Sequence, residues 1–468
     1  MGGLIGDRSR EPPRELDGTP ARPRVQRVPD VQEIVVITRR PHLPVAVAVA
    51  VIGALLVACS SGERSAAPRA RSTSTTTTTT RPGADSVLTI GQLAPLTGPI
   101  AIISNSFTVP VRLAVDEINL SGGVNGKPVG LVVADDGSES ATARAAATSL
   151  VDASHADALV GPSTSQAALD LVTRPTEHRA VICSGSNSYG PISNVARRDG
   201  YYFRTAPPDR LQAGALAKLL IADGRTRPVV IAARDDYGLP FGTEILRGLV
   251  AGHVTGGRLI TRRAGDAGAR RAVTETLARQ PDAVVLIGFP DGVAPVLRAL
   301  IAQGKGPTQI PIYGSDGLQN AELGALVDPA NPAVVATLKG TTPSGAPTGI
   351  DHPFNARLFA AGVEAFFSAS TYDCVILIAL AAVAARSDDP QAIRDHFAKN
   401  LTGKTVCTGF LECADALRRG KAIRYHGASS TFDNWAVFEP GDGAFDVWTL
   451  GLDARPTLAP PTQQLRVP

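Results

Sequence analysis

From residue 86 onward, short β-rich runs alternate with longer amphipathic runs of helical period. The pattern predicts strands at 86–93, 128–134, 158–161, 180–183, 228–233, 258–261, 283–288 and 310–313. It predicts helices at 109–119, 142–153, 165–177, 211–222, 242–251, 270–279, 292–303, 352–368 and 371–386, and further strands around 432–450. Strands that alternate with helices of this length form right-handed βαβ crossovers and parallel sheets. The chain is therefore predicted to be an α/β protein, and its length suggests two domains.

The segment before the first predicted strand has a different pattern. An apolar run at 45–58 follows Arg39, Arg40 and His42 and stops at Cys59. It is too short to span a membrane and is typical of the h-region of a signal peptide. Its end, Leu56-Val57-Ala58-Cys59, resembles the bacterial lipobox, in which the cysteine thiol is lipidated before cleavage. The alternative is an ordinary cleaved signal peptide with an incidental cysteine.

We therefore assign 1–58 to a leader and lipoprotein signal peptide, with Cys59 as the lipidation site. Residues 59–85 include six consecutive threonines at 75–80 and cannot bury a core, so they are predicted to be a solvated tether. An acyl-modified cysteine at the start of this tether would hold the folded part at the outer face of the cell membrane.

Composition narrows the classes of function. The chain is 44% hydrophobic and 19% charged with a formal net charge of +3, and it has no Lys/Arg stripe with interleaved aromatics, which argues against nucleic acid. No Cys/His spacing suits zinc, so neither a metal nor another cofactor is expected. No Gly-x-Ser-x-Gly elbow, P-loop or dinucleotide glycine motif occurs, so no catalytic residue is assigned. A secreted hydrolase stays as a minor alternative.

The landmarks of the predicted α/β region resemble the type I periplasmic binding proteins of the branched-chain amino-acid (Leu/Ile/Val-binding) class, including actinobacterial lipoproteins. These landmarks are, in order, Ile90 to Pro99, Ala114 to Asn119, Gly122 to Gly126, Val132 to Asp136, Gly161 with Ser165, Asp236-Tyr237-Gly238, Gly288-Phe289, Gly314 to Gly317 and Tyr372-Asp373. The resemblance implies two Rossmann-like lobes with parallel sheets, joined by a three-stranded hinge. It places lobe 1 at 86–206 plus 338–428, lobe 2 at 207–337 plus 429–455, and a tail at 456–468, with crossings near Ala206, Leu338 and Ser430.

The resemblance also implies a site for the carboxylate of an amino acid in lobe 1. Ser165 matches the family's carboxylate-binding serine, although a serine before a helix also serves as an N-cap. Gly185 matches the residue whose carbonyl accepts from the ligand ammonium. Asn187 stands where the family has Thr or Ser, so either Asn187 or Ser186 must supply the hydroxyl or amide contact. A Ser/Gly/Asn cluster is otherwise a common turn.

In lobe 2 the resemblance assigns three more residues. Asp316 matches the acid that pairs with the α-ammonium group, and an ionised carboxylate gives a charge-assisted bond there. An Asp-Gly pair is also a common turn signal. Tyr237 and Phe289 match aromatics that close over the ligand. The first loop has Ile102-Ile103-Ser104 where many relatives place an aromatic, which changes the expected pocket wall. The ligand that the resemblance implies is therefore not restricted to leucine, isoleucine or valine, and we expect an amino acid, branched-chain or related, or an amide-like molecule.

The remaining expectations concern cysteines and partners. Cys407 and Cys413 are predicted to form a disulfide after export, as the resemblance to actinobacterial members supports, whereas Cys183 and Cys374 are predicted to be buried free thiols. The resemblance implies a monomer that delivers a small molecule to the permease and ATPase subunits of an ABC importer through hinge closure. The alternative is a sensor of the same fold that passes its ligand signal to another partner.

Overall fold

A computed structural model describes residues 86–468 except 174–179, 195–199, 236, 348 and 364. The leader, Cys59 and the tether lie outside the described residues. The described chain is an α/β protein whose two main sheets are separate, one all parallel and one with five parallel strands and an antiparallel edge. This confirms the fold class expected from the alternating pattern.

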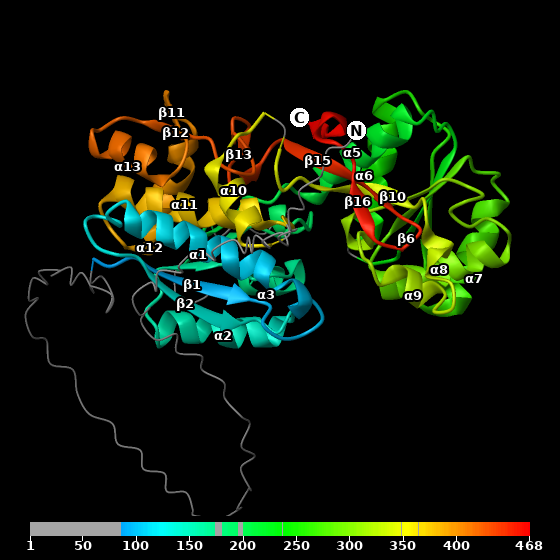
Figure 1. The fold of residues 1–468 in the computed structure, drawn as a ribbon, viewed down its shortest axis with the longest axis horizontal. Coiled ribbons are helices and arrows are strands. Elements are labelled where there is room, and N and C mark those ends of the chain that lie inside the picture. Colours follow the sequence, from blue (N-terminus) through cyan, green and yellow to red (C-terminus); the bar gives the residue numbers. More distant parts are fainter. Residues whose placement is uncertain (1–85, 174–179, 195–199, 236, 348, 364) are drawn as a thin grey trace, which may run out of the picture. The chain divides into compact units, whose positions relative to one another are not determined.

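The first sheet has the strand order β2 (Gly130–Asp135), β1 (Thr89–Ala94), β3 (Ala158–Val160), β4 (Val181–Ser184) and β5 (Tyr202–Arg204), and all its neighbours are parallel. Helices α1 (Asn105–Leu120), α11 (Ser368–Ala385) and α12 (Pro390–Phe397) cover one face, and α2 (Ser140–Asp152) and α3 (Ser165–Thr173) cover the other. Figure 1 shows β1 and β2 between α1 and α2.

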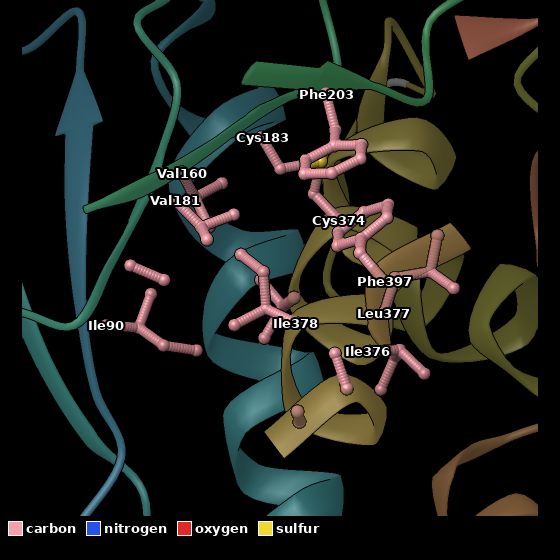
Figure 2. Close-up of a cluster of buried hydrophobic side chains, with 14 of the residues drawn as sticks. Ile90, Val160, Val181, Cys183, Phe203, Cys374, Ile376, Leu377, Ile378 and Phe397 are labelled. Carbon is pink, nitrogen blue, oxygen red and sulfur yellow. A yellow bond between two sulfur atoms is a disulfide. The ribbon is translucent and has the colours of Figure 1, made fainter. Parts of the chain in front are cut away.

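Helix α11 is the centre of the first core. It is long and apolar enough to cross a membrane by composition, but most of it is buried against the sheet and its neighbouring helices. Figure 2 shows Ile376, Leu377 and Ile378 of this helix among side chains from the first sheet and α12. A helix that is apolar on all sides belongs in the interior of a protein, and here that interior is the first α/β region.

Cys183 and Cys374 form a disulfide in this core (Figure 2). The prediction of two free thiols is therefore wrong. Cys183 lies in β4 and Cys374 in α11, and their Cα atoms are 5.6 Å apart. The two positions are separated by 191 residues, so only the packing of α11 on β4 brings them together, which the sequence does not reveal. The predicted disulfide between Cys407 and Cys413 is present, with a Cα separation of 5.3 Å.

The second sheet repeats the order of the first. Strands β7 (Arg258–Arg262), β6 (Pro228–Ala233), β8 (Ala283–Ile287), β9 (Ile312–Gly314) and β10 (Lys339–Pro343) are parallel. Strand β15 (Gly443–Leu450) then pairs antiparallel to β10, and it also pairs with β16 (Pro456–Leu458) and β17 (Leu465–Val467). Helices α5 (Asp209–Ala222) and α6 (Gly238–Ala251) share one core with this sheet, and α7 (Gly265–Leu277), α8 (Pro290–Ala302) and α9 (Leu323–Val327) share another.

The sheet assignments move the expected lobe boundaries. Strand β10 belongs to the second sheet, so the chain leaves this sheet after Pro343 rather than near Leu338. Residues 429–442 lie with the first region, because Phe432 and Phe438 are part of its core. The expected tail at 456–468 contains β16 and β17, and both strands pair with β15 at the edge of the second sheet.

The remaining elements differ from the pattern mainly at their ends. The expected helix at 352–368 is α10 (Pro353–Ala360), which ends before Gly362 at a φ of 68°. Glycine adopts this left-handed conformation readily and ends helices for that reason. Helix α13 (Phe410–Arg418) and the strand pairs β11 (Thr405–Cys407) with β12 (Ile423–Tyr425), and β13 (Trp435–Ala436) with β14 (Glu439–Pro440), complete the first region.

Candidate functional site

Both sheets reverse their strand order at equivalent places, between β1 and β3 in the first and between β6 and β8 in the second. Ligands of open parallel sheets bind beyond the carboxyl ends of the strands at such points. Every residue assigned to ligand binding follows the carboxyl end of a strand at or next to these points. Ser165 follows β3, Gly185 to Asn187 follow β4, Tyr237 follows β6, Phe289 follows β8 and Asp316 follows β9.

The loop between β3 and α3 is held in place by a buried acid. Asp136 accepts hydrogen bonds from the Ser138 N–H at 2.8 Å and from the Ser163 N–H at 2.7 Å. Thr164 precedes α3, and its hydroxyl accepts from the Ala167 N–H at 3.4 Å, so Thr164 rather than Ser165 has the position of the N-cap. The loop is thus fixed with the start of α3 at the edge of the site.

Two hydroxyls in this loop are candidates for a ligand carboxylate. The Ser165 hydroxyl accepts from the Tyr189 N–H at 3.4 Å, which leaves its own proton for another acceptor. The buried Ser163 hydroxyl has no hydrogen-bond partner among the described residues. Sequence reasoning named Ser165 and missed Ser163. The run of hydroxyl residues before α3 indicates a polar loop, but it does not indicate which hydroxyl lacks a hydrogen-bond partner.

The loop after β4 is packed tightly against the first core. A side chain at Gly185 would meet the Thr371 backbone nitrogen at 2.3 Å, so glycine is required by the approach of α11. The Ser186 hydroxyl donates to the Ser163 carbonyl at 2.9 Å. The side chain of Asn187 is fully buried: it donates to the Pro162 carbonyl at 3.0 Å and accepts from the Tyr202 hydroxyl at 3.1 Å.

These contacts distinguish Asn187 from Ser186 as the residue that could replace the Thr or Ser by which relatives contact their ligand. Asn187 connects the loops after β3 and β4, and both of its amide atoms are engaged inside the protein. Ser186 is only partly buried. Its hydroxyl oxygen can still accept a hydrogen bond, so Ser186 is the better candidate of the two for ligand contact, and the ligand roles of Gly185, Ser186 and Asn187 stay predictions.

In the second region the two aromatic candidates lie together. Tyr237 and Phe289 stack with ring centroids 5.7 Å apart, and Phe241 contacts Tyr237 edge to face at 5.6 Å. Phe289 is 63% exposed, which is unusual for a phenylalanine at the end of a buried strand. Tyr237 also packs against the core of the first region. The pair therefore forms an apolar wall beside the end of β9.

Asp316 begins a short 3-10 helix, η2 (Asp316–Leu318), next to this wall. Gly317 lies under the Phe289 ring, where any side chain would collide with the Gly288 carbonyl at 2.6 Å. Burial raises the pKa of Asp316, although a hydrogen bond from Gln212 lowers it. Burial also raises the pKa of Tyr237 well above its ordinary value, with a further contribution from the Asp316 charge.

Sequence reasoning missed a second acid at this place, Asp209, the first residue of α5. Burial raises its pKa to about 7. A hydrogen bond with Ser188 lowers the pKa, the negative charge of Asp316 raises it, and the positive charge of Arg204 lowers it. An acid in the first turn of a helix is common, because it complements the helix dipole. No pattern around Asp209 indicates that this acid is buried or that the charge of Asp316 acts on it.

The structure also has a cavity of about 350 Å³ away from these residues. Its lining includes Asp223, Arg225, Tyr313 and Lys339. Tyr313 and Lys339 lie at the start of β9 and β10, so this cavity is at the opposite end of the strands from the candidate site. Within the part of the chain that the structure describes, no group of three or more His, Cys, Asp or Glu side chains could hold a metal ion.

The comparisons with known proteins agree with this geometry. The family model described as periplasmic binding protein matches residues 87–423, and the chain belongs to this family. Its landmarks and relatives identify it as a type I periplasmic binding protein of the branched-chain amino-acid class. The family is one of solute-binding proteins and implies an extracytoplasmic location.

Two curated relatives illustrate the class. The chain is 26% identical over 392 residues to the "Chemotactic signal transduction system substrate-binding protein BasB" of Halobacterium salinarum, which covers 80% of this chain and 90% of that one. It is 29% identical over 249 residues to the "Leu/Ile/Val-binding protein BraC3" of Rhizobium johnstonii, which covers 52% of this chain and 65% of that one.

Solved structures share the fold. The branched-chain amino-acid transporter substrate-binding protein LivJ from Streptococcus pneumoniae, in complex with isoleucine, has a TM-score of 0.59 and 22% identity, covering 81% of this chain and 99% of that one. A solute-binding protein of an ABC transporter from R. palustris, in complex with 4-hydroxybenzoate, also has a TM-score of 0.59, with 14% identity and coverage of 81% and 97%.

Proposed function

We propose that this protein is a lipid-anchored extracytoplasmic solute-binding protein of an ABC importer. It captures an amino acid, branched-chain or related, or an amide-like small molecule, between two α/β lobes that close on it. The observation that carries the proposal is the arrangement of the strand ends. Hydroxyls follow β3 and β4 of the first sheet, and a carboxylate beside two stacked aromatics follows the strands of the second.

This arrangement suits a zwitterion. The start of α3, with the Ser163 and Ser165 hydroxyls, would take the ligand carboxylate, because helix N-termini favour anions. Asp316 would take the ammonium group through a charge-assisted hydrogen bond. Tyr237 and Phe289 would cover the side chain. A ligand that contacts both regions would shift the equilibrium toward the closed form, since it binds this form better.

The chain crosses between the two regions at three places, which would form the hinge. These are the segments between β5 and α5, between β10 and α10, and between β14 and β15. The first is tied to the site, because the Asp209 N–H donates to the Ser188 carbonyl at 2.8 Å. Closure about these segments would bring the wall of Tyr237 and Phe289 toward the loops after β3 and β4.

A thermal-shift screen of the purified protein tests the proposed ligand class. The panel contains the standard amino acids, their 2-hydroxy analogues, short amides, urea, and benzoate with 4-hydroxybenzoate. A bound ligand stabilises the protein by RT ln(1 + [L]/Kd), so a ligand present at about 100 times its Kd adds about 2.7 kcal/mol. We expect stabilisation by an amino acid or an amide. Stabilisation by benzoates alone would contradict the proposal.

The lipid anchor has its own test. Cys59→Ser removes the thiol that would carry the acyl chains, so the protein should move from the membrane fraction to the medium or the soluble fraction. Stable anchoring needs about two buried chains, and no other residue of the predicted tether supplies them. The Cys59→Ser protein remaining in the membrane fraction would overturn this part of the proposal.

A second candidate function is a sensor that binds the same ligand and signals through another partner. It is favoured by the name of the Halobacterium salinarum relative, which places that protein in chemotactic signal transduction. Deletion of the gene separates the two functions. Loss of uptake of the radiolabelled ligand favours import, and unchanged uptake with loss of a response to the ligand favours sensing.

A further inference from the structure

The buried start of α5 carries two side-chain oxygen atoms that have no hydrogen-bond partner among the described residues. The Asp209 side chain is 6% exposed, and its Oδ1 atom has no hydrogen-bond partner among the described residues. Gln212 lies one turn further along α5 and is 1% exposed. Its amide nitrogen donates to the Thr341 carbonyl at 2.8 Å, but its Oε1 atom also has no partner among the described residues.

Asp316 completes this group. The Gln212 amide lies close enough to Asp316 to lower the pKa of that carboxyl, and the charge of Asp316 in turn raises the pKa of Asp209. Helix α5 and η2 both pack against β10, where the Gln212 amide is bonded, so the three side chains lie in the same part of the second region. We call Asp209, Gln212 and Asp316 the acceptor triad.

The cation whose charge lowers the pKa of Asp209 does not supply the missing donors. Arg204, on β5, gives its Nε and Nη2 hydrogens to Glu439 at 3.0 and 2.5 Å and another Nη2 hydrogen to the Ser193 hydroxyl at 2.7 Å. Its Nη1 group donates to the carbonyls of Asn187 and Tyr189 at 2.9 and 3.0 Å. All five guanidinium hydrogens are used in this way, and the buried Glu439 balances the charge.

Buried acceptors that lack donors cost free energy, and two carboxylates at one place also repel each other. A primary ammonium removes both penalties, because it carries a positive charge and three N–H donors. We propose that the acceptor triad is the subsite for the ligand's ammonium group, with Asp209 as a specificity-determining residue beside Asp316. This inference rests on the proposed function, and it restricts the ligand to compounds with a primary ammonium group.

The triad also links binding to a proton. Burial raises the pKa of Asp209 to about 7, with Asp316 and Arg204 as the charged groups and Tyr237 as the titratable group around it. Below this pH the empty protein holds a proton on Asp209. When the ammonium group enters, the Asp209 carboxyl loses this proton to solvent and accepts N–H bonds as a carboxylate. Affinity therefore rises with pH up to about 7 and levels off there, until the ligand's ammonium group itself begins to lose its proton.

Two measurements test the inference, with the amino acids of the panel and their 2-hydroxy analogues as probes. The first is calorimetry of the wild-type protein at pH 6 in two buffers of different ionisation enthalpy. It should detect release of most of one proton with an amino acid, and no such release at pH 8.5. The second is the Asp209→Asn variant, which should bind the amino acid about tenfold to hundredfold more weakly, the range of one charged hydrogen bond.

Asp446→Asn is the matched control. Burial also raises the pKa of Asp446, and it lies on β15, where it accepts from Gln464 at 2.7 Å. Its substitution should leave affinity and proton release unchanged. Equal amino-acid affinity of Asp209→Asn and wild type, or no proton release at pH 6, would overturn the inference while the proposed function stands.

Three other outcomes distinguish failure of the inference from failure of the proposed function. Wild-type protein that binds only compounds without an ammonium group would overturn both the inference and the amino-acid part of the proposed function. Binding of amides but no amino acid would overturn the inference alone. Stabilisation by no member of the panel would overturn both.

Discussion

The two α/β regions have the same order of parallel strands but supply opposite chemistry at their strand ends. In the first region the ends of β3 and β4 carry hydroxyls and a helix start that suit an anion. In the second, the ends of β8 and β9 and the start of α5 carry carboxylates and aromatic rings. Because the two regions share a fold, only the residues in the loops after their strands give them different chemistry. A ligand with an anionic and a cationic end would be oriented by this difference alone.

The regions also differ in how they are held together. The first contains both disulfides of the described chain and the buried helix α11. The second relies on its two apolar cores and on the antiparallel strands β15 to β17. We expect the first region to be the more rigid partner, with its loops fixed before the ligand arrives.

Removal of the disulfide between Cys183 and Cys374 should have the largest effect. In the chain-entropy description a cross-link over 191 residues stabilises by about 5 kcal/mol, and one over six residues by about 2 kcal/mol. The double variant Cys183→Ala/Cys374→Ala should therefore lose more stability in denaturant than Cys407→Ala/Cys413→Ala. Hydrogen exchange should show the loss in the first region. Equal losses in both variants would contradict this prediction.

The second largest effect is the dependence of the unfolding free energy on pH. The pKa of Asp209 in the folded protein is about 7, above its ordinary value near 4, so ionising it costs stability. The unfolding free energy of the empty protein should fall as pH rises from 4 to 7, by at most about 4 kcal/mol for three pKa units. Asp209→Asn should flatten this decline, as measured by denaturant unfolding at several pH values. A decline of the same size in the variant would count against the assignment.

Asp316→Ala should weaken binding of a ligand with an ammonium group by about hundredfold, or about 3 kcal/mol, since it removes a charged partner. Calorimetry measures the change. Asp266→Ala, on the exposed start of α7, is the control and should bind as the wild type does. Unchanged affinity in Asp316→Ala would remove Asp316 from the site.

Phe289→Ala should have the smallest effect. The Phe289 ring is 63% exposed, so its removal should cost little stability. Affinity should fall about tenfold, because the ring covers the ligand only after closure. Phe359→Ala, on α10 and 87% exposed, is a matched control that should change neither property. A large loss of stability in Phe289→Ala would indicate a core role instead.

The fold could be predicted largely from local pattern. Helices and strands such as those in the first and second sheets have clear periods of 3.6 and 2 residues. The lobe boundaries were less accurate, because β10 and β16 are short and owe their place to pairing with β9 and β15. Such strands have no strong pattern of their own, and tertiary contacts decide their sheet.

The site shows the same limit. Tyr237, Phe289 and Asp316 could be named from motifs, and the structure brings them together. Asp209 could not, because its burial depends on the packing of α5 against the loop that contains Ser188. The disulfide of Cys183 was missed for a similar reason, as its partner is distant in sequence.

A crystal structure with the tightest-binding amino acid of the panel would reveal directly how the ligand is oriented between the two regions. We predict that the ligand ammonium lies within hydrogen-bond distance of Asp316 and Asp209, with the carboxylate at the start of α3 near Ser163 and Ser165. A ligand bound in the reverse orientation, or bound in the cavity near Tyr313, would contradict it.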